Sequence, residues 1–356
     1  MESTQTQLEQ PSPPPGSAGH GTGVATLSAN AQVASAPRPT LAERLRSTPP
    51  SWIWGTLLGL GGYIAIMHFT LGNRWEQFGA AAIFLSVVVW SDRTRRFAMG
   101  MLPMLAQGVI YDLTHLTQPL VKYLHVHIEE PYWFDKTFFG IPTALGRVTP
   151  NEFFATRFWA PVDFVTGSAY ILFLYWSLLF CGYLSATASN DERYRRALRY
   201  GWAFFVMNVV GYATYYIYPA APPWYVTEHG FGPPDFTVMS SAAAAVRWDA
   251  MTGLGYFKAF YGRSADVFGA IPSLHVAHPL LIAVYALEFK SRALKVGSFL
   301  FYALMCFSAV YLQHHYVLDV LIGSAFALGA YWLVERLFAA QAERVPVRAE
   351  PSPGIA

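Results

Sequence analysis

Two histidines and an aspartate stand close together in the segment HHYVLDVLIG, residues 314–323. His315 and Asp319 are four residues apart, so on a helix they would lie on the same face. A carboxylate that accepts a hydrogen bond from one imidazole nitrogen fixes the tautomer and makes the other nitrogen a better base or nucleophile. The spacing therefore predicts an oriented histidine that can attack an electrophile.

A third histidine, His275, lies in FGAIPSLHVAHP, residues 268–279. Pro272 suits the first turn of a helix, so His275 is expected near a helix start. Ser273 and the free N–H groups of that helix start could bind an anion such as phosphate. An oriented histidine, a second histidine and an anion site are the parts needed for phosphoryl transfer through a phosphohistidine.

Other interpretations of these residues stay open. Two histidines and a carboxylate are also a known metal-ligand set, although the sequence has no HExxH spacing. Histidines at a membrane boundary can simply be hydrated, and His314 could either be hydrated or contact a headgroup. A proton relay in a transporter is less favoured, because the last four apolar segments have no charged residue near their centres and the chain has no internal repeat.

Composition places the chain in a membrane. Of its 356 residues, 54% are hydrophobic and only 13% are charged, whereas a soluble domain carries about 25% charged residues. The 11 Trp, 21 Tyr and 26 Phe are typical of side chains at lipid–water boundaries. The net charge of +2 gives no reason to expect a nucleic-acid partner. These features predict an all-α polytopic membrane protein.

Eight apolar segments are candidates for transmembrane helices. They cover residues 52–72, 76–90, 97–116, 163–184, 198–217, 272–288, 296–313 and 317–337. The five clusters of Arg and Lys between and beyond them all fall on one side if both termini are cytoplasmic. That topology predicts that His275 and His315 face the extracytoplasmic side.

The chain divides into four parts by composition. Residues 1–50 are rich in Pro, Gly, Ser and Ala and are expected to form a disordered cytoplasmic tail. Residues 51–96 hold two transmembrane helices, residues 97–338 form the catalytic membrane domain, and residues 339–356 form a second disordered cytoplasmic tail. The tail at residues 1–50 lacks the basic and apolar regions of a signal peptide.

The two histidine segments resemble the second and third signature motifs of the type 2 phosphatidic acid phosphatase (PAP2) superfamily. YPAAPPWY (218–225) and LPMLAQGVIYD (102–112) are similar to segments of its inositol phosphorylceramide synthase branch. The resemblance covers residues 97–337 and implies a six-helix PAP2-like core preceded by two extra helices. It implies that His315 is the nucleophile, that Asp319 orients it, and that His275 protonates the leaving oxygen and then deprotonates the acceptor hydroxyl.

The sequence also departs from the PAP2 phosphatases. Leu274 replaces the glycine of their PSGH segment, and Ser308-Ala309 stands where their third motif has Ser-Arg. Their first motif, Lys-x6-Arg-Pro, is missing ahead of FGAIPSLH. A phosphomonoester carries up to two negative charges and is bound best by several cations. A diester carries one negative charge and needs fewer cations. The missing arginines therefore favour a diester donor.

The sequence predicts a metal-independent lipid phosphotransferase without a cofactor. It would move a phospho-headgroup, such as inositol phosphate from phosphatidylinositol, to a lipid hydroxyl. The resemblance implies that this hydroxyl is that of ceramide. The alternatives are a PAP2-type lipid phosphatase and a non-catalytic transporter. The expected partners are the lipid donor, the lipid acceptor and the bilayer, and the oligomeric state stays open. The membrane would be the plasma (inner) membrane in a bacterium or the Golgi membrane in a eukaryote. The residues expected to bind substrate are Ser273, Arg263, His314, Trp224 and Tyr225, with Lys258 and Arg247 as further candidate cations.

Overall fold

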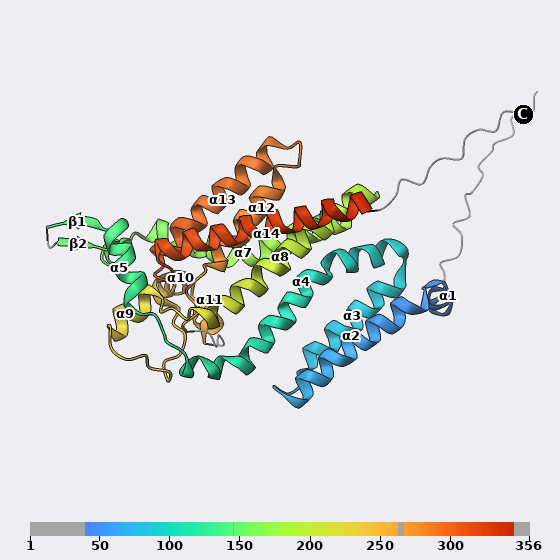
Figure 1. Ribbon diagram of the computed structural model, residues 1–356, viewed down its shortest axis with the longest axis horizontal. Helices are drawn as coiled ribbons and strands as arrows, with labels where there is room; N and C mark the ends of the chain where they lie inside the picture. The colour runs from blue at the N-terminus through green and yellow to red at the C-terminus, as the bar shows by residue number, and fades with distance from the viewer. Residues whose placement is uncertain (1–39, 145, 263–266, 345–356) are drawn as a thin grey trace, which may run out of the picture. The chain divides into compact units, whose positions relative to one another are not determined.

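The computed structural model describes residues 40–144, 146–262 and 267–344, and these residues are mostly helical (Figure 1). A helix lies at each of the eight apolar segments. These helices are α2 (Pro50–Phe69), α3 (Trp75–Trp90), α4 (Asp92–Thr117), α7 (Ala160–Ala186), α8 (Asp191–Ile217), α12 (Leu274–Ala286), α13 (Arg292–Tyr311) and α14 (Val317–Arg344). Four of them, α2, α7, α13 and α14, are long and apolar enough to cross a membrane, while α3 and α12 are shorter apolar helices.

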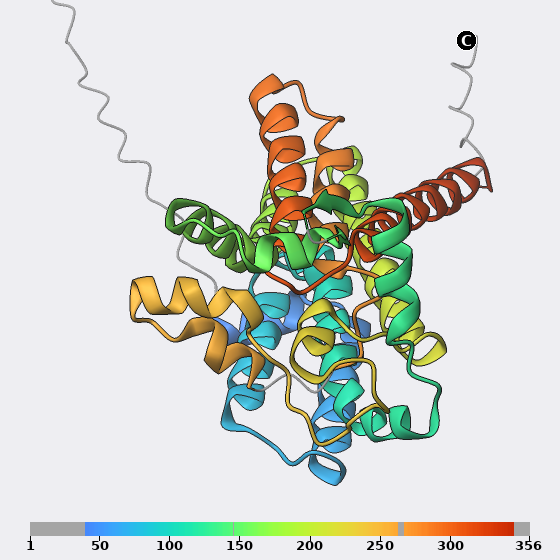
Figure 2. The ribbon, with the colours of Figure 1, turned by 90° about the vertical axis from the view of Figure 1, so that its left-hand side faces the viewer.

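Short elements fill the two long connections of the chain, between α4 and α7 and between α8 and α12. They are η1 (Gln118–Tyr123), α5 (Glu129–Phe138), β1 (Ile141–Thr143), β2 (Gly146–Val148), α6 (Pro150–Ala155), α9 (Pro223–His229), η2 (Ala243–Ala245), α10 (Val246–Thr252) and α11 (Tyr256–Tyr261). Strands β1 and β2 pair antiparallel, with Ile141 opposite Val148. Both connections gather at one end of the long helices, which we call the site end and which Figure 2 shows end-on.

Two boundaries differ from the sequence prediction. Leu41–Ser47, placed in the N-terminal disordered tail, forms the short helix α1. Helix α14 continues to Arg344, beyond the predicted span and into the predicted C-terminal tail. The remaining tail residues, 1–39 and 345–356, lie outside the described part of the chain.

Helix α12 is the centre of the bundle. Eleven of its thirteen residues are buried, and it packs against α7, α8, α13 and α14. A helix that is apolar on all sides is stable when protein surrounds it, so its length does not have to match the bilayer. This explains why the sixth apolar segment is short. Its first turn carries His275, so the most enclosed helix of the bundle positions a predicted catalytic residue.

Charged pairs join three helices at the end opposite the site end. Arg196 and Arg199 of α8 contact Glu288, which follows α12, at 2.7 and 2.8 Å. Arg199 also contacts Glu335 of α14, which accepts a hydrogen bond from the Tyr285 hydroxyl at 3.0 Å. One of the basic clusters that the sequence analysis used for topology is therefore partly buried and has a structural role.

The close packing of α14 against the start of α12 depends on Gly323. A Cβ atom at this position would lie 2.2 Å from the carbonyl oxygen of Ser273 and 3.0 Å from its carbonyl carbon. Both are backbone atoms, so no side chain can rotate away to make room. Any larger residue must push α14 away from the segment that leads into His275.

We expect Gly323→Ala to destabilise the protein by about 1–3 kcal/mol, the usual cost of overpacking a core. The apparent midpoint of thermal unfolding in detergent, followed by tryptophan fluorescence, should fall by several degrees. Gly329→Ala is the matched control, because it lies on the same helix and a Cβ there meets nothing within 4 Å. Equal midpoints for the two variants would contradict the prediction.

Candidate active site

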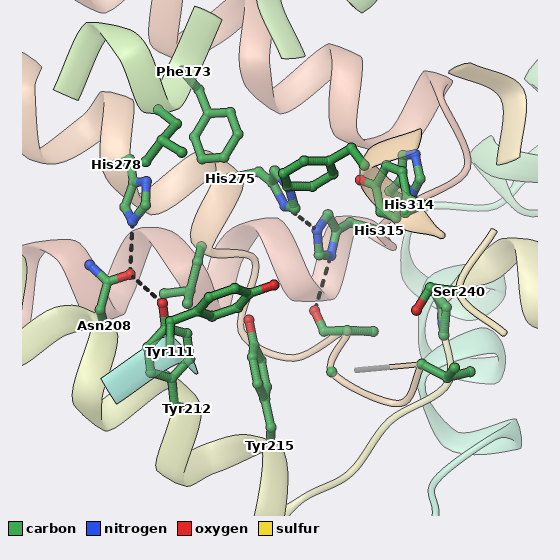
Figure 3. Close-up of a pocket in the computed structure, with 18 of the residues that line it drawn as sticks. Tyr111, Phe173, Asn208, Tyr212, Tyr215, Ser240, His275, His278, His314 and His315 are labelled. Atoms are coloured by element: carbon green, nitrogen blue, oxygen red, sulfur yellow. Dashed lines mark hydrogen bonds between the residues drawn. The ribbon is translucent and has the colours of Figure 1, made fainter. Parts of the chain in front are cut away.

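His275 and His315 meet at the site end of the bundle (Figure 3). His275 stands in the first turn of α12, and His315 lies in the turn between α13 and α14. The Nδ1 atom of His275 is 3.1 Å from the Nε2 atom of His315, a hydrogen-bond distance. The structure therefore brings together the two histidines that the sequence analysis singled out.

The surroundings of His315 determine where its proton lies. Its Nδ1 atom is 3.0 Å from the carbonyl oxygen of Ala270 and 3.4 Å from a carboxylate oxygen of Asp319. Both are acceptors, so Nδ1 carries the hydrogen and Nε2 keeps its lone pair. His275 must then donate from Nδ1 to that lone pair. The sequence pattern identified Asp319 but missed Ala270, the nearer acceptor.

The Ala270 carbonyl is held in place by pairing between loop segments. Ala220 donates its N–H to Phe268 at 2.8 Å and accepts the N–H of Ala270 at 3.2 Å. His127 lies on the other side of Ala220, with its N–H donated to Pro219 at 2.8 Å. Three segments distant in sequence thus form a short ladder, and the carbonyl at its edge orients His315.

Two carboxylates accept hydrogen bonds from the backbone N–H groups at the start of α14. Asp319 accepts the Tyr316 N–H at 2.9 Å. Asp135 of α5 accepts the Val317 and Leu318 N–H groups at 2.8 and 3.0 Å, and its side chain is fully buried. These are N–H groups that a helix start leaves without intrahelical partners, and negative charge is favourable there. Asp135 therefore positions the helix that follows His315, a role that sequence reasoning missed.

Burial raises the pKa of Asp135 to about 6, against the opposing effect of the hydrogen bonds from Val317 and Leu318. Between about pH 4 and 6 the folded protein keeps a proton that the unfolded chain has released. The associated stability is present below pH 4 and lost as the pH rises through 6. A rise of about two pKa units corresponds to about 3 kcal/mol.

We expect Asp135→Asn to remove this part of the pH dependence, because an amide does not titrate. The measurement is the thermal midpoint of each protein at pH 4, 5, 6 and 7. The difference between wild type and variant should change most between pH 4 and 6, whereas parallel profiles would show that Asp135 is not the titrating group.

His314 is buried rather than hydrated. Its ring lies between Tyr170 and Tyr261, with ring centroids 5.2 and 4.6 Å away and interplanar angles of 17° and 9°. Burial, together with the neighbouring His315, lowers the pKa of His314 to about 3, so the ring is neutral at physiological pH. His314 is therefore shielded from bulk solvent, and its remaining contact is with the cavity described next.

A cavity of about 300 Å³ opens beside the histidine pair. Residues of α4, α7, α8, α12 and the loops at the site end line it, among them His275, His314, His315 and Trp224. The described residues that line it include no Lys, Arg, Asp or Glu. The cavity therefore offers imidazoles, hydroxyls and aromatic rings, but no full charge from that part of the chain.

Two of the other predicted substrate contacts, Tyr225 and Ser273, lie outside the described lining of the cavity. Tyr225 is buried, and its hydroxyl accepts the Asp235 N–H at 2.8 Å. Ser273 is fully buried, and its N–H donates to the backbone oxygen of Asp319 at 3.0 Å. Neither belongs to the described lining of the cavity. Arg263 lies outside the described residues.

The two further candidate cations also lie away from the cavity. Arg247 pairs with the buried Asp163 at 2.7 Å, and its guanidinium lies over the rings of Phe158 and Tyr311. Lys258 is exposed on α11. Neither lines the cavity as the structure describes it.

The described residues contain one group of side chains close enough to hold a metal ion. It consists of His125, His127 and Glu130, whose ligand atoms lie within 4.8 Å of one another. The His127 ring also stacks on Tyr218, with centroids 3.7 Å apart. The two histidines stand in the loop before α5, and Glu130 lies in the first turn of α5. The group contains none of the three predicted catalytic residues.

This chain is similar to one protein family and to several curated proteins. The family model described as "PAP2 superfamily" matches residues 147–333, which include the two histidines and Asp319. The phosphoinositol dihydroceramide synthase of Bacteroides thetaiotaomicron is 34% identical over 269 residues, which cover 75% of this chain and 86% of that protein. The inositol phosphorylceramide synthase of Candida albicans is 32% identical over 140 residues, or 38% of this chain and 29% of the relative.

The inositol phosphorylceramide synthase catalytic subunit of Saccharomyces cerevisiae is 32% identical over 124 residues, or 34% of this chain and 30% of the relative. No solved structure matches the chain significantly. The apolar helices and these relatives together support an integral membrane protein. Since the family model covers more than half of the chain and the bacterial relative aligns over most of its length, the resemblance found in the sequence is confirmed and the chain belongs to the PAP2 superfamily.

Proposed function

We propose that the protein is a membrane lipid phosphotransferase that moves inositol phosphate from phosphatidylinositol to the hydroxyl of a ceramide-type lipid. The observation that carries the proposal is the His275–His315 pair, at 3.1 Å, inside a cavity whose described lining has no charged residue. The relatives named as synthases of phosphoinositol ceramides support the choice of headgroup and acceptor.

In the first half of the proposed reaction, Nε2 of His315 attacks phosphorus after the donor has entered between the two rings. The N–P bond forms and the bond from phosphorus to the diacylglycerol oxygen breaks. His275, which must enter this step with a proton on both ring nitrogens, gives its Nδ1 proton to that oxygen and becomes neutral. The positive charge that develops on His315 is stabilised at its Nδ1–H by Ala270 and Asp319. No step in this sequence requires a metal ion.

In the second half, the acceptor hydroxyl attacks phosphorus. Its proton passes to Nδ1 of His275, the N–P bond breaks, and both histidines return to their starting protonation states. The acceptor must therefore reach the same side of the cavity that the diacylglycerol oxygen has left. Water in its place would make the enzyme a hydrolase that releases inositol phosphate.

The lining of the cavity favours a diester donor. Each additional negative charge on a phosphate must be met by a cation or left desolvated at high cost. The described lining contains no Lys or Arg. Of the two candidate cations outside it, Arg247 is paired with Asp163 and Lys258 is exposed. A singly charged phosphodiester suits these surroundings better than a dianionic monoester.

We also propose that the site end faces the extracytoplasmic side, with both termini in the cytoplasm. This orientation puts the basic clusters inside, including the one whose Arg196 and Arg199 lie at the opposite end of the bundle. The membrane would be the inner membrane in a bacterial host or the Golgi membrane in a eukaryotic host.

The test is a transfer assay with purified protein in detergent, phosphatidylinositol labelled in the inositol phosphate, and a chelator present throughout. Acceptor-dependent formation of a labelled phosphosphingolipid would support the proposal. Release of water-soluble inositol phosphate at the same rate with and without acceptor would make the protein a lipid hydrolase that cleaves the phosphodiester. Absence of turnover in every mixture would favour a transporter.

A further inference from the structure

His278 is a buried imidazole with an unused acceptor beside the reacting groups. It lies three residues after His275 on α12, lines the same cavity and is 5% exposed. Its Nε2 atom is 2.9 Å from the side-chain oxygen of Asn208 on α8, as Figure 3 shows. Its Nδ1 atom is buried and has no hydrogen-bond partner among the residues that the structure describes.

The position of the proton on His278 follows from its neighbours. Asn208 donates from Nδ2 to the carbonyl oxygen of Phe204 at 2.8 Å, so its amide oxygen must face His278. An oxygen acceptor requires a donor, and Nε2 therefore carries the hydrogen. The ring is also held between Phe173 and Phe204, with centroids 5.4 and 4.6 Å away. Nδ1 therefore carries a lone pair in a fixed position, and no hydrogen-bond donor of the described residues reaches it.

Two further hydrogen bonds fix the side chain of Asn208, which contacts His278. The Tyr212 hydroxyl donates to the same oxygen of Asn208 at 3.5 Å, and Gln107 of α4 donates to Tyr212. These side chains come from α4, α8 and α12, and Figure 3 shows Asn208 between His278 and Tyr212. A buried acceptor that the protein holds in place but leaves unpaired is costly unless a ligand satisfies it.

The spacing identifies the ligand group. Three helical residues span about 4.5 Å, and such residues lie on the same face of a helix. A lipid whose hydroxyl oxygen is at His275 therefore presents to His278 the atoms three or four bonds away from that oxygen. In a ceramide-type lipid these include an amide N–H and a second hydroxyl. A diacylglycerol has only ester groups there, which donate no hydrogen bond.

We propose that His278 Nδ1 accepts a hydrogen bond from the amide N–H or the second hydroxyl of the acceptor lipid, and so selects sphingoid acceptors over diacylglycerol. This inference rests on the proposed transferase function. His278 is here a specificity residue, since the proton transfers remain with His275. The same contact would also hold the reacting hydroxyl near His275.

The test compares wild type with His278→Phe, which keeps a flat ring between Phe173 and Phe204 but lacks the acceptor. We expect kcat/KM for ceramide to fall about tenfold, the usual effect of one lost hydrogen bond. Transfer to a diacylglycerol with chains unlike those of the donor, and the slow release of inositol phosphate to water, should stay unchanged. His68→Ala, on the exposed end of α2, removes an imidazole away from the cavity and is the matched control.

Two acceptor analogues test the contact in the unaltered protein. N-methylation removes the amide N–H of ceramide, and 3-O-methylation removes its second hydroxyl hydrogen. With wild type, kcat/KM for the analogue that lacks the hydrogen-bonding group should be about tenfold lower than for ceramide. With His278→Phe, that analogue and ceramide should have equal kcat/KM. The inference is wrong if His278→Phe lowers kcat/KM equally for all acceptors, or if wild type uses both analogues as well as ceramide. If wild type transfers to no acceptor, the proposed function itself fails.

Discussion

His315→Ala is expected to lower kcat/KM for headgroup transfer by at least about 10³-fold, because it removes the nitrogen proposed to form the covalent bond to phosphorus. In the structure only His315 combines an oriented Nδ1–H with a lone pair that faces a proton donor, as judged from the described residues. The measurement is the initial rate of labelled product formation over a range of donor concentrations.

His229→Ala is the control for this variant, because His229 stands on α9 and does not belong to the described cavity lining. The thermal midpoints of both variants should first be shown to lie close to that of wild type. A rapid acid quench with donor labelled at phosphorus gives a second readout. Labelled protein should form in wild type without acceptor and be absent from His315→Ala. Transfer within tenfold of wild type would remove His315 from the nucleophile role.

His275→Ala is expected to lower kcat/KM by about 10² to 10⁴-fold with phosphatidylinositol, because the diacylglycerol oxygen then leaves without a proton. The size of the loss should depend on the leaving group. With a nitrophenyl ester of the same inositol phosphate, the first step needs no proton donor, and the variant should form the phosphoenzyme at a rate close to that of wild type. The measurement is the burst of nitrophenolate.

An equal loss with both donors would contradict the role of general acid and point to a contribution of His275 to phosphate binding instead. His278→Phe is a useful companion, because His278 lies one turn further along α12 and should leave the nitrophenolate burst unchanged. The two variants therefore separate proton transfer from recognition of the acceptor on one helix.

Hydropathy and motif spacing predicted much of this molecule. A helix lies at each of the eight apolar runs, because a chain in a bilayer must satisfy its backbone within each helix. His275, His315 and Asp319 are adjacent as predicted. Their side chains are of chemically distinctive types in short segments, so the sequence shows them directly.

The rest depends on contacts between distant segments. Ala270 orients His315 through a backbone oxygen, which has no side-chain signature in a sequence. Asp135 is one of several acidic residues in a loop of mixed charge, and its role exists only because α5 packs at the start of α14. The stacking of His314 likewise requires Tyr170 and Tyr261 from two other elements.

The hydrogen bond between His275 and His315 has a consequence for donor affinity. In the proposed reaction one nitrogen approaches phosphorus to about 3 Å while the leaving oxygen is bonded to the other, so the two nitrogen atoms must be about 6 Å apart or more. In the structure Nδ1 of His275 and Nε2 of His315 are 3.1 Å apart, which leaves no room for the phosphate between them. The donor therefore binds only the fraction of molecules in which the pair has opened. For each 1.4 kcal/mol by which closure is favoured, the apparent dissociation constant is about tenfold weaker than the intrinsic one.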